Sequence, residues 1–140
     1  MSMSVFKIFD VAGSGMSAQM LRLNTVASNL ANAETMASNP QDVYKARHPV
    51  FESVLDQFSN QQDAATVKVS EIVESNTAPI PHYMPGHPMA NPDGYVFSPG
   101  INAVEEMADM ISASRSYQNN IEVLSTTKEL LLRTLQLGRS

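Results

Sequence analysis

Apolar residues recur with heptad spacing at each end of this 140-residue chain. Near the N-terminus, steps of four and three residues alternate along a seam of apolar or small side chains: Phe9, Gly13, Met16, Met20, Leu23, Ala27 and Leu30. This spacing predicts an amphipathic helix from about Val5 to Asn32, roughly 40 Å long. Pro40 prevents that helix from running further.

The C-terminal seam is longer and only Ser114 and Lys128 interrupt it. Its members are Ala103, Met107, Met110, Ser114, Tyr117, Ile121, Leu124, Lys128, Leu131 and Leu135. Asn102 has the chemistry of an N-cap, Glu105 brings negative charge to the first turn, and Gly138 is a typical C-terminal stop. We predict a helix from about Ala103 to Leu137, roughly 50 Å long.

Each long helix needs another long helix beside it, because a small middle segment cannot cover its seam. The predicted fold is mainly α: the N-terminal and C-terminal helices pack as an antiparallel coiled-coil-like pair, with a small irregular or β middle region. The chain divides into an N-terminal axial helix (1–35), a middle region (36–100) and a C-terminal axial helix (101–140). Two helices leave apolar surface exposed, so further copies or related partners are expected. The alternative is a monomeric bundle whose core uses both seams.

Glycines and asparagines in the first helix allow two interpretations each. Gly13 and Gly15 cost about 1 kcal/mol each relative to Ala. They indicate either close packing against a neighbour or a local kink. Asn29 and Asn32 either hydrogen-bond neighbouring subunits or satisfy backbone groups near the helix end.

The middle of the chain contains all eight Pro and all three His. Apolar spacing predicts a short helix from about Val50 to Ser59, followed by a polar loop over Asn60 to Asp63. Alternation predicts a strand from Val67 to Val73, and a turn over Asn91 to Gly94 leads into a second strand at 95–97. These two strands are expected to form a hairpin or small sheet. The Pro-rich link at 78–88 is expected to be extended.

Composition and motifs argue against catalysis. A net charge of −5 with scattered cations disfavours nucleic acid, and the absence of Cys excludes disulfides and thiolate chemistry. His82, His87 and Asp93 match no metal motif, so we expect a surface loop and no cofactor. Ser125 and Lys128 match S-x-x-K without its companion elements. No apolar run approaches a membrane span, and no cleavable signal peptide is expected.

Several stretches resemble the flagellar axial proteins, the family of rod and hook subunits. They are 27–35 (ASNLANAET), 85–88 (PGHP), 91–96 (NPDGYV), 112–120 (SASRSYQNN) and 135–138 (LQLG). The T-x-G-Y turn of many axial proteins is missing after Thr35, which favours the short rod subunits.

The resemblance implies a non-enzymatic structural subunit of the proximal rod of the basal body. Its terminal helices would build a tubular axis that transmits motor torque and encloses the export channel. Implied partners are other copies, the rod proteins FlgB, FlgF and FlgG, the rod-base protein FliE and the flagellar type III export apparatus, with assembly in the periplasm. The alternative is a secreted helical adaptor that docks a partner helix. The expected assembly interface is Phe9, Met16, Met20, Leu23, Leu30, Asn29, Asn32, Met107, Met110, Tyr117, Ile121, Leu124, Leu131 and Leu135.

Overall fold

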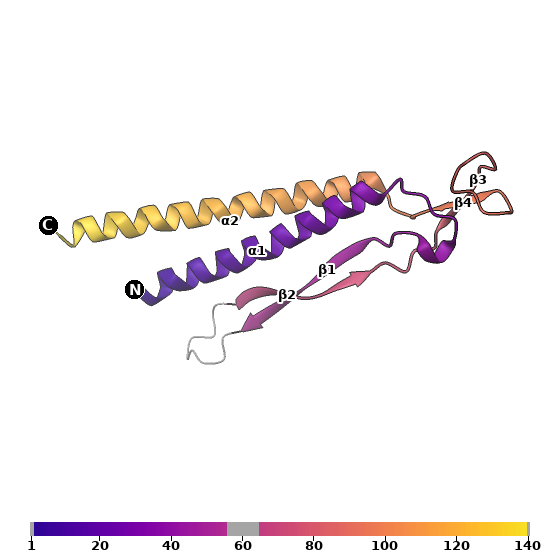
Figure 1. The fold of residues 1–140 in the computed structure, drawn as a ribbon. Coiled ribbons are helices and arrows are strands. Elements are labelled where there is room, and N and C mark those ends of the chain that lie inside the picture. The colour runs from indigo at the N-terminus through magenta and orange to yellow at the C-terminus, as the bar shows by residue number, and fades with distance from the viewer. Residues whose placement is uncertain (1, 56–64, 140) are drawn as a thin grey trace.

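Two long helices run side by side in opposite directions in the computed structural model, which describes residues 2–55 and 65–139. They are α1 (Ser2–Asn32) and α2 (Ala103–Leu137), and the two ends of the chain lie at the same end of the molecule (Figure 1). The bounds predicted for the second helix are confirmed, while the first helix begins earlier than predicted. The antiparallel packing of the terminal helices is confirmed.

The ends of α2 follow the predicted capping chemistry. The side-chain oxygen of Asn102 accepts hydrogen bonds from the backbone N–H groups of Val104 (3.1 Å) and Glu105 (3.4 Å). These bonds satisfy two of the amide groups that a helix leaves unpaired in its first turn. Gly138 follows the last helical residue, and its N–H donates to the carbonyl of Thr134 (3.0 Å).

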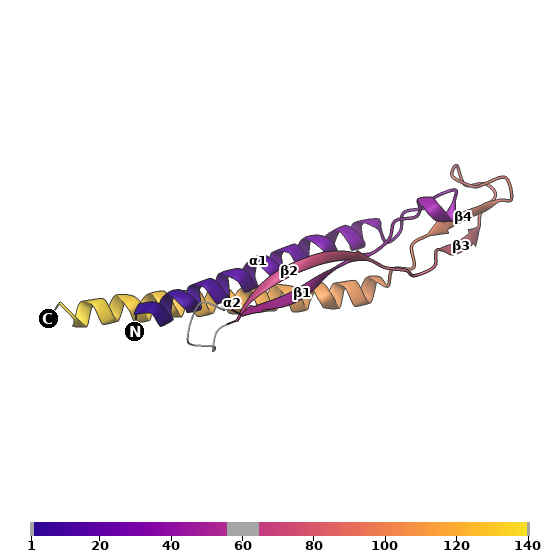
Figure 2. The same cartoon turned by 90° about the horizontal axis from the view of Figure 1, so that it is seen from below.

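A long antiparallel ribbon, β1 (Arg47–Leu55) with β2 (Ala65–Glu74), runs back along α1 (Figures 1 and 2). The strand predicted at 67–73 is confirmed within β2. The short helix predicted over 50–59 is wrong where the structure describes it, because residues 50–55 belong to β1. The remainder of that helix and the polar loop predicted at 60–63 lie outside the described residues. The spacing of Val50 and Val54 suits a helix, but pairing with β2 and the β propensity of these side chains prevail.

A second, smaller ribbon lies beyond the ends of the helices, away from the chain termini (Figure 1). It pairs β3 (Ile80–Tyr83) with β4 (Tyr95–Ser98), and a single 3₁₀ turn, η1 (Pro40–Asp42), lies beside it. The predicted turn before β4 is confirmed, since the N–H of Gly94 donates to the carbonyl of Asn91 (2.9 Å) and Gly94 has a positive φ of 85°. The two predicted strands do not pair with each other, because each has a partner nearer in sequence.

The predicted fold class, mainly α, is therefore wrong. The structure is 52% helical and 22% strand, which makes it a mixed fold. Strand pairing depends on backbone hydrogen bonds between separate segments. The residues of β1, β2 and β3 are mostly exposed on both faces, whereas β4 buries Val96 and Ser98 on one face. Where a strand has no buried face, the alternating pattern that signals it is weak.

The core is narrow and is built from small side chains. Its buried apolar residues, in the part of the chain described, are Ala12, Ala18, Val26, Ala37, Val43, Ala46, Val96 and Ala113. The helix α1 lies between α2 on one side and the β1–β2 ribbon on the other (Figure 1). Most large apolar side chains of the helices consequently remain accessible to solvent.

Candidate assembly surface

Small and polar residues form the contact between the two helices. On α2 the buried residues are Glu106, Ala113 and Thr127, which are separated by multiples of seven. On α1, a Cβ atom placed on Gly15 would lie 2.9 Å from Nδ2 of Asn120, so the two helix backbones approach closely there. Of the two interpretations of the glycines, close packing therefore holds for Gly15.

The large apolar residues of the predicted seams lie at the edges of this contact or outside it. Half-buried members are Phe9, Met16, Leu23, Leu30, Met110, Tyr117, Leu124 and Leu131, and exposed members are Met20, Met107, Ile121 and Leu135. The helix α2 turns Ala113 and Thr127 inward in place of their seam neighbours Ser114 and Lys128. A search for large apolar side chains misses a contact of this kind, because close backbone approach selects small ones.

An exposed apolar stripe runs along α2 beside the helix contact. We call it the outer stripe and define it by Val104, Met107, Ile111, Ile121, Leu132 and Leu135, whose exposed fractions range from 44% to 75%. These positions follow their own alternation of steps of three and four, interrupted by the polar residues 114, 118, 125 and 128. Apolar residues aligned along one face in this way typically mark an interaction surface.

An open groove of about 410 Å³ brings residues of the two predicted seams together. Met16 and Met20 of α1 and Tyr117 of α2 line it, with Ser17, Leu21 and Asn24. Methionine side chains adapt their shape to a partner more readily than branched side chains do. The groove thus offers a second apolar surface, one to which both helices contribute.

Asn29 lies at the centre of a hydrogen-bond network and is fully buried. Its Oδ1 accepts from the hydroxyl of Tyr44 (2.9 Å) and from the backbone N–H of Arg47 (2.9 Å). Its Nδ2 donates to the backbone carbonyl of Arg47 (2.9 Å) and to Oε2 of Glu106 (3.1 Å). The amide thus pairs with both backbone groups of Arg47, as a neighbouring strand would, and connects α1, β1 and α2.

For Asn29 this network differs from both interpretations, whereas Asn32 bonds a backbone group near the helix end, as the second interpretation has it. Asn29 makes its four bonds within the chain, whereas Nδ2 of the half-buried Asn32 donates only to the carbonyl of Ser28 (2.9 Å), in the last turn of α1. Glu106 was not among the interface residues predicted from the sequence. In the structure Glu106 is buried, and Nε2 of His48 lies 3.9 Å from its Oε1. The sequence did offer one signal for this role, because Glu106 directly precedes Met107 of the predicted seam.

A further ion pair joins the helices at the edge of the contact. Nη2 of Arg22 lies 2.9 Å from Oδ1 of Asp109. The two side chains are 26% and 38% exposed, so solvent screens the pair and its contribution to stability is at most about 1 kcal/mol. It supports the observed alignment of α1 and α2 without dominating it.

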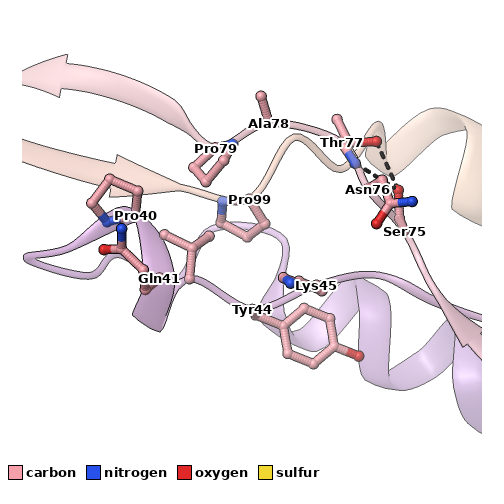
Figure 3. Close-up of a pocket in the computed structure, with 11 residues that line it drawn as sticks. Pro40, Gln41, Tyr44, Lys45, Ser75, Asn76, Thr77, Ala78, Pro79 and Pro99 are labelled. Atoms are coloured by element: carbon pink, nitrogen blue, oxygen red, sulfur yellow. Dashed lines mark hydrogen bonds between the residues drawn. The ribbon is translucent and has the colours of Figure 1, made fainter.

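A hollow of about 280 Å³ lies where the middle region meets the helix pair (Figure 3). Its lining comes from η1 and the residues after it, from 75–79 and from Pro99. Three prolines and several small polar side chains shape it, and the N–H of Thr77 donates to Oγ of Ser75 (3.2 Å). No His, Asp, Glu or Cys is among its lining residues, so the hollow lacks the usual metal-binding groups, and its titratable side chains are those of Tyr44 and Lys45.

The other chemical candidates have ordinary local roles. Nε2 of His82 shares a hydrogen bond with Oγ of Ser98 (2.9 Å), and Nδ1 of His87 accepts from the N–H of Met89 (3.1 Å). Within residues 2–55 and 65–139, no three His, Asp or Glu side chains gather closely enough to hold a metal ion. No described helix combines the length and apolar character needed to cross a membrane.

Comparison with known proteins connects both helices to one group. The family described as "Flagella basal body rod protein" matches residues 9–36, and the family described as "Flagellar basal body rod FlgEFG protein C-terminal" matches residues 93–137. Curated relatives named flagellar basal-body rod protein FlgC include one from Escherichia coli O6:H1, 45% identical over 98% of this chain and 100% of the relative. One from Salmonella typhimurium is 44% identical over 98% and 100%, and one from Aquifex aeolicus is 43% identical over 96% and 97%.

Proposed function

Because the chain belongs to the family of flagellar basal-body rod proteins FlgC, we propose that its two long helices pack against those of neighbouring subunits to form the tubular axis of the proximal rod. The chain is a structural subunit of the basal-body rod. In this proposal the outer stripe and the groove at Met16 and Tyr117 are the assembly surfaces, and the tube transmits torque and encloses the export channel.

The outer stripe carries this proposal. Completely burying a large aliphatic or methionine side chain contributes about 1.5–3 kcal/mol, so burying the exposed half of one contributes about 1 kcal/mol. Six such residues together contribute several kcal/mol per subunit before the costs of association. The buried core of the single chain, in contrast, consists mainly of alanines. A long helix pair with so little core of its own gains most of its stability from neighbours.

We further propose that the neighbours are the rod proteins FlgB, FlgF and FlgG, the rod-base protein FliE and other copies of this chain. The match of residues 93–137 to a C-terminal segment described for FlgE, FlgF and FlgG supports packing of like helices. In this proposal the chain passes through the flagellar type III export apparatus and assembles in the periplasm. A narrow, alanine-rich core would ease the unfolding that passage through a channel requires.

Light scattering of the purified chain mixed with other rod subunits tests the proposal. A rod subunit adds to a growing assembly, so the average particle mass obtained from the scattering should keep rising with protein concentration. A helical adaptor would instead reach a constant particle mass, because it stops at a fixed stoichiometry. Ile111→Ser removes an apolar side chain from the outer stripe and should slow growth. Val123→Ser removes a similarly exposed apolar residue of α2 outside the stripe and should have a smaller effect. Equal growth rates of the two variants would refute the proposal that the outer stripe is an assembly surface.

A further inference from the structure

The network around Asn29 joins elements that are far apart in the sequence, and it leaves the amide fully satisfied. A primary amide has two donor hydrogens and two acceptor positions on its oxygen, and Asn29 uses all four. Its partner Glu106 is buried on the opposite helix. Such a pair discriminates between alignments of the two helices. An alignment that separates the two groups leaves a buried polar group without a hydrogen-bond partner.

Two contacts along the helix pair belong to the same antiparallel register. Asn29 contacts Glu106, and Gly15 closely approaches Asn120. Moving fourteen residues back along α1, from Asn29 to Gly15, corresponds to moving fourteen residues forward along α2. The two helices therefore keep one alignment over two heptads.

Packing alone selects this register poorly. If α1 slid along α2 by one heptad, about 10 Å, Gly15 would lie opposite Ala113 or Thr127 in place of Asn120. Each of these side chains is small enough to meet a glycine. The slide toward Ala113 would also bring Arg22 to the position that Asn29 now occupies, opposite Glu106, so that register has an ion pair of its own to offer.

The buried polar pair penalises both slid registers. Asn29 would then lie opposite Pro99, before the start of α2, or opposite Ala113. Neither side chain can accept its Nδ2 hydrogens. In the register that brings Asn29 opposite Ala113, Glu106 would also lose its amide donor without a replacement. An unpaired buried polar group costs more than a hydrogen bond contributes. A single buried asparagine fixes the register of coiled coils by the same physics.

We propose that Asn29 and Glu106 are register-setting residues that select one axial alignment of α1 against α2. Through Arg47, the same amide seats the β1–β2 ribbon in that alignment. This role concerns the single chain and does not depend on the proposed function. Its consequence for assembly does rest on that function: a subunit slid by a heptad would present its outer stripe about 10 Å out of line with its neighbours.

Engineered cysteine pairs in the full-length chain report the register, because the natural sequence has no Cys. Gly15→Cys combined with Asn120→Cys reports the observed alignment, and the second substitution removes the amide that Cβ of residue 15 would otherwise meet. Gly15→Cys combined with Ala113→Cys or with Thr127→Cys reports the two slid alignments. Intramolecular cross-links formed on mild oxidation are quantified by non-reducing electrophoresis and peptide mass spectrometry.

The reporters are placed in four backgrounds. Asn29→Leu and Glu106→Leu remove the polar pair, and each should lower the ratio of observed to slid cross-links at least about tenfold. Asn32→Leu is the matched control, because the side chain of Asn32 donates to a carbonyl of its own helix and does not contact α2 through a hydrogen bond, and its ratio should equal that of the parent. Glu106→Gln retains an acceptor for Asn29 and should also keep the parent ratio.

Helix content measured by circular dichroism completes the test. An unchanged ratio in both Leu variants, with parental helix content, would overturn the proposal. If Asn29→Leu alone loses helix, Glu106→Leu decides, because it leaves the bonds from Asn29 to Tyr44 and Arg47 in place. Loss of helix in both Leu variants would also overturn it, since the pair would then be required for folding rather than for alignment.

Discussion

Ile121→Asp separates assembly from folding of the subunit. Ile121 belongs to the outer stripe and is 44% exposed, so a carboxylate at this position remains hydrated in the single chain. In an assembled rod the same side chain would be enclosed by apolar neighbours. We therefore expect a subunit that is made, exported and folded but does not assemble.

The expected effect on assembly is large. The exposed part of Ile121 contributes about 1 kcal/mol when a neighbour buries it, and Asp loses this contribution. An unpaired carboxylate in an apolar contact costs several kcal/mol more. At about 1.4 kcal/mol for each factor of ten, the association constant should fall by roughly a thousandfold or more.

Motility in soft agar, combined with immunoblots of periplasmic fractions, measures the two steps separately. Asn119→Asp is the control, because Asn119 is exposed on another face of α2 and the substitution adds the same charge. The Ile121 variant should be non-motile with normal protein in the periplasm, and the Asn119 variant should be milder. Swimming of the Ile121 variant at the normal rate would refute the assignment of the outer stripe to the interface.

Three further outcomes are expected. Gly13→Ala should stabilise the isolated chain by up to about 1 kcal/mol in urea unfolding, because a Cβ there meets nothing within 4 Å, whereas Gly15→Ala should gain less because it displaces an amide of α2. Equal gains would contradict the close approach at Gly15. Val96→Ala, at a fully buried position, should destabilise the chain by about 2 kcal/mol in the same assay, and no change would mean that the β3–β4 ribbon unfolds separately. Replacing His82 and His87 together by Ala should leave motility intact, and loss of motility with normal protein level would indicate a site there.

Secondary structure was predictable where one local signal was strong. The repeat of apolar residues over five heptads, with Asn102 before it and Gly138 after it, located α2 to the residue. The segment that forms β1 carried a conflicting signal, since Val50, Val54 and Leu55 fit one face of a helix as well as a strand. Only the pairing of β1 with β2, a contact between separate segments, decided between them.

For the candidate assembly surface too, the sequence predicted one part and only the structure showed the rest. The sequence identified Met107, Ile121 and Leu135 as members of an apolar seam, and the structure leaves them exposed on α2. It could not indicate that Ala113 and Glu106 turn inward beside them, because the orientation of a helix about its axis depends on the shape of the helix it meets. It offered no signal for the partners of Asn29, whose four hydrogen bonds come from two segments, residues 44–47 and α2.

The sequence by itself determined that the chain has two long amphipathic helices, since periodicity and capping depend only on residues near one another. It also determined the family, because the stretches that resemble rod proteins can be read without a structure. Tertiary structure alone decided the register of the helices, the pairing of the strands and the division of apolar residues between contact and exposed surface. These features depend on which segments, far apart in the sequence, approach closely enough to exclude water. Residues adjacent in the sequence do not determine that distance.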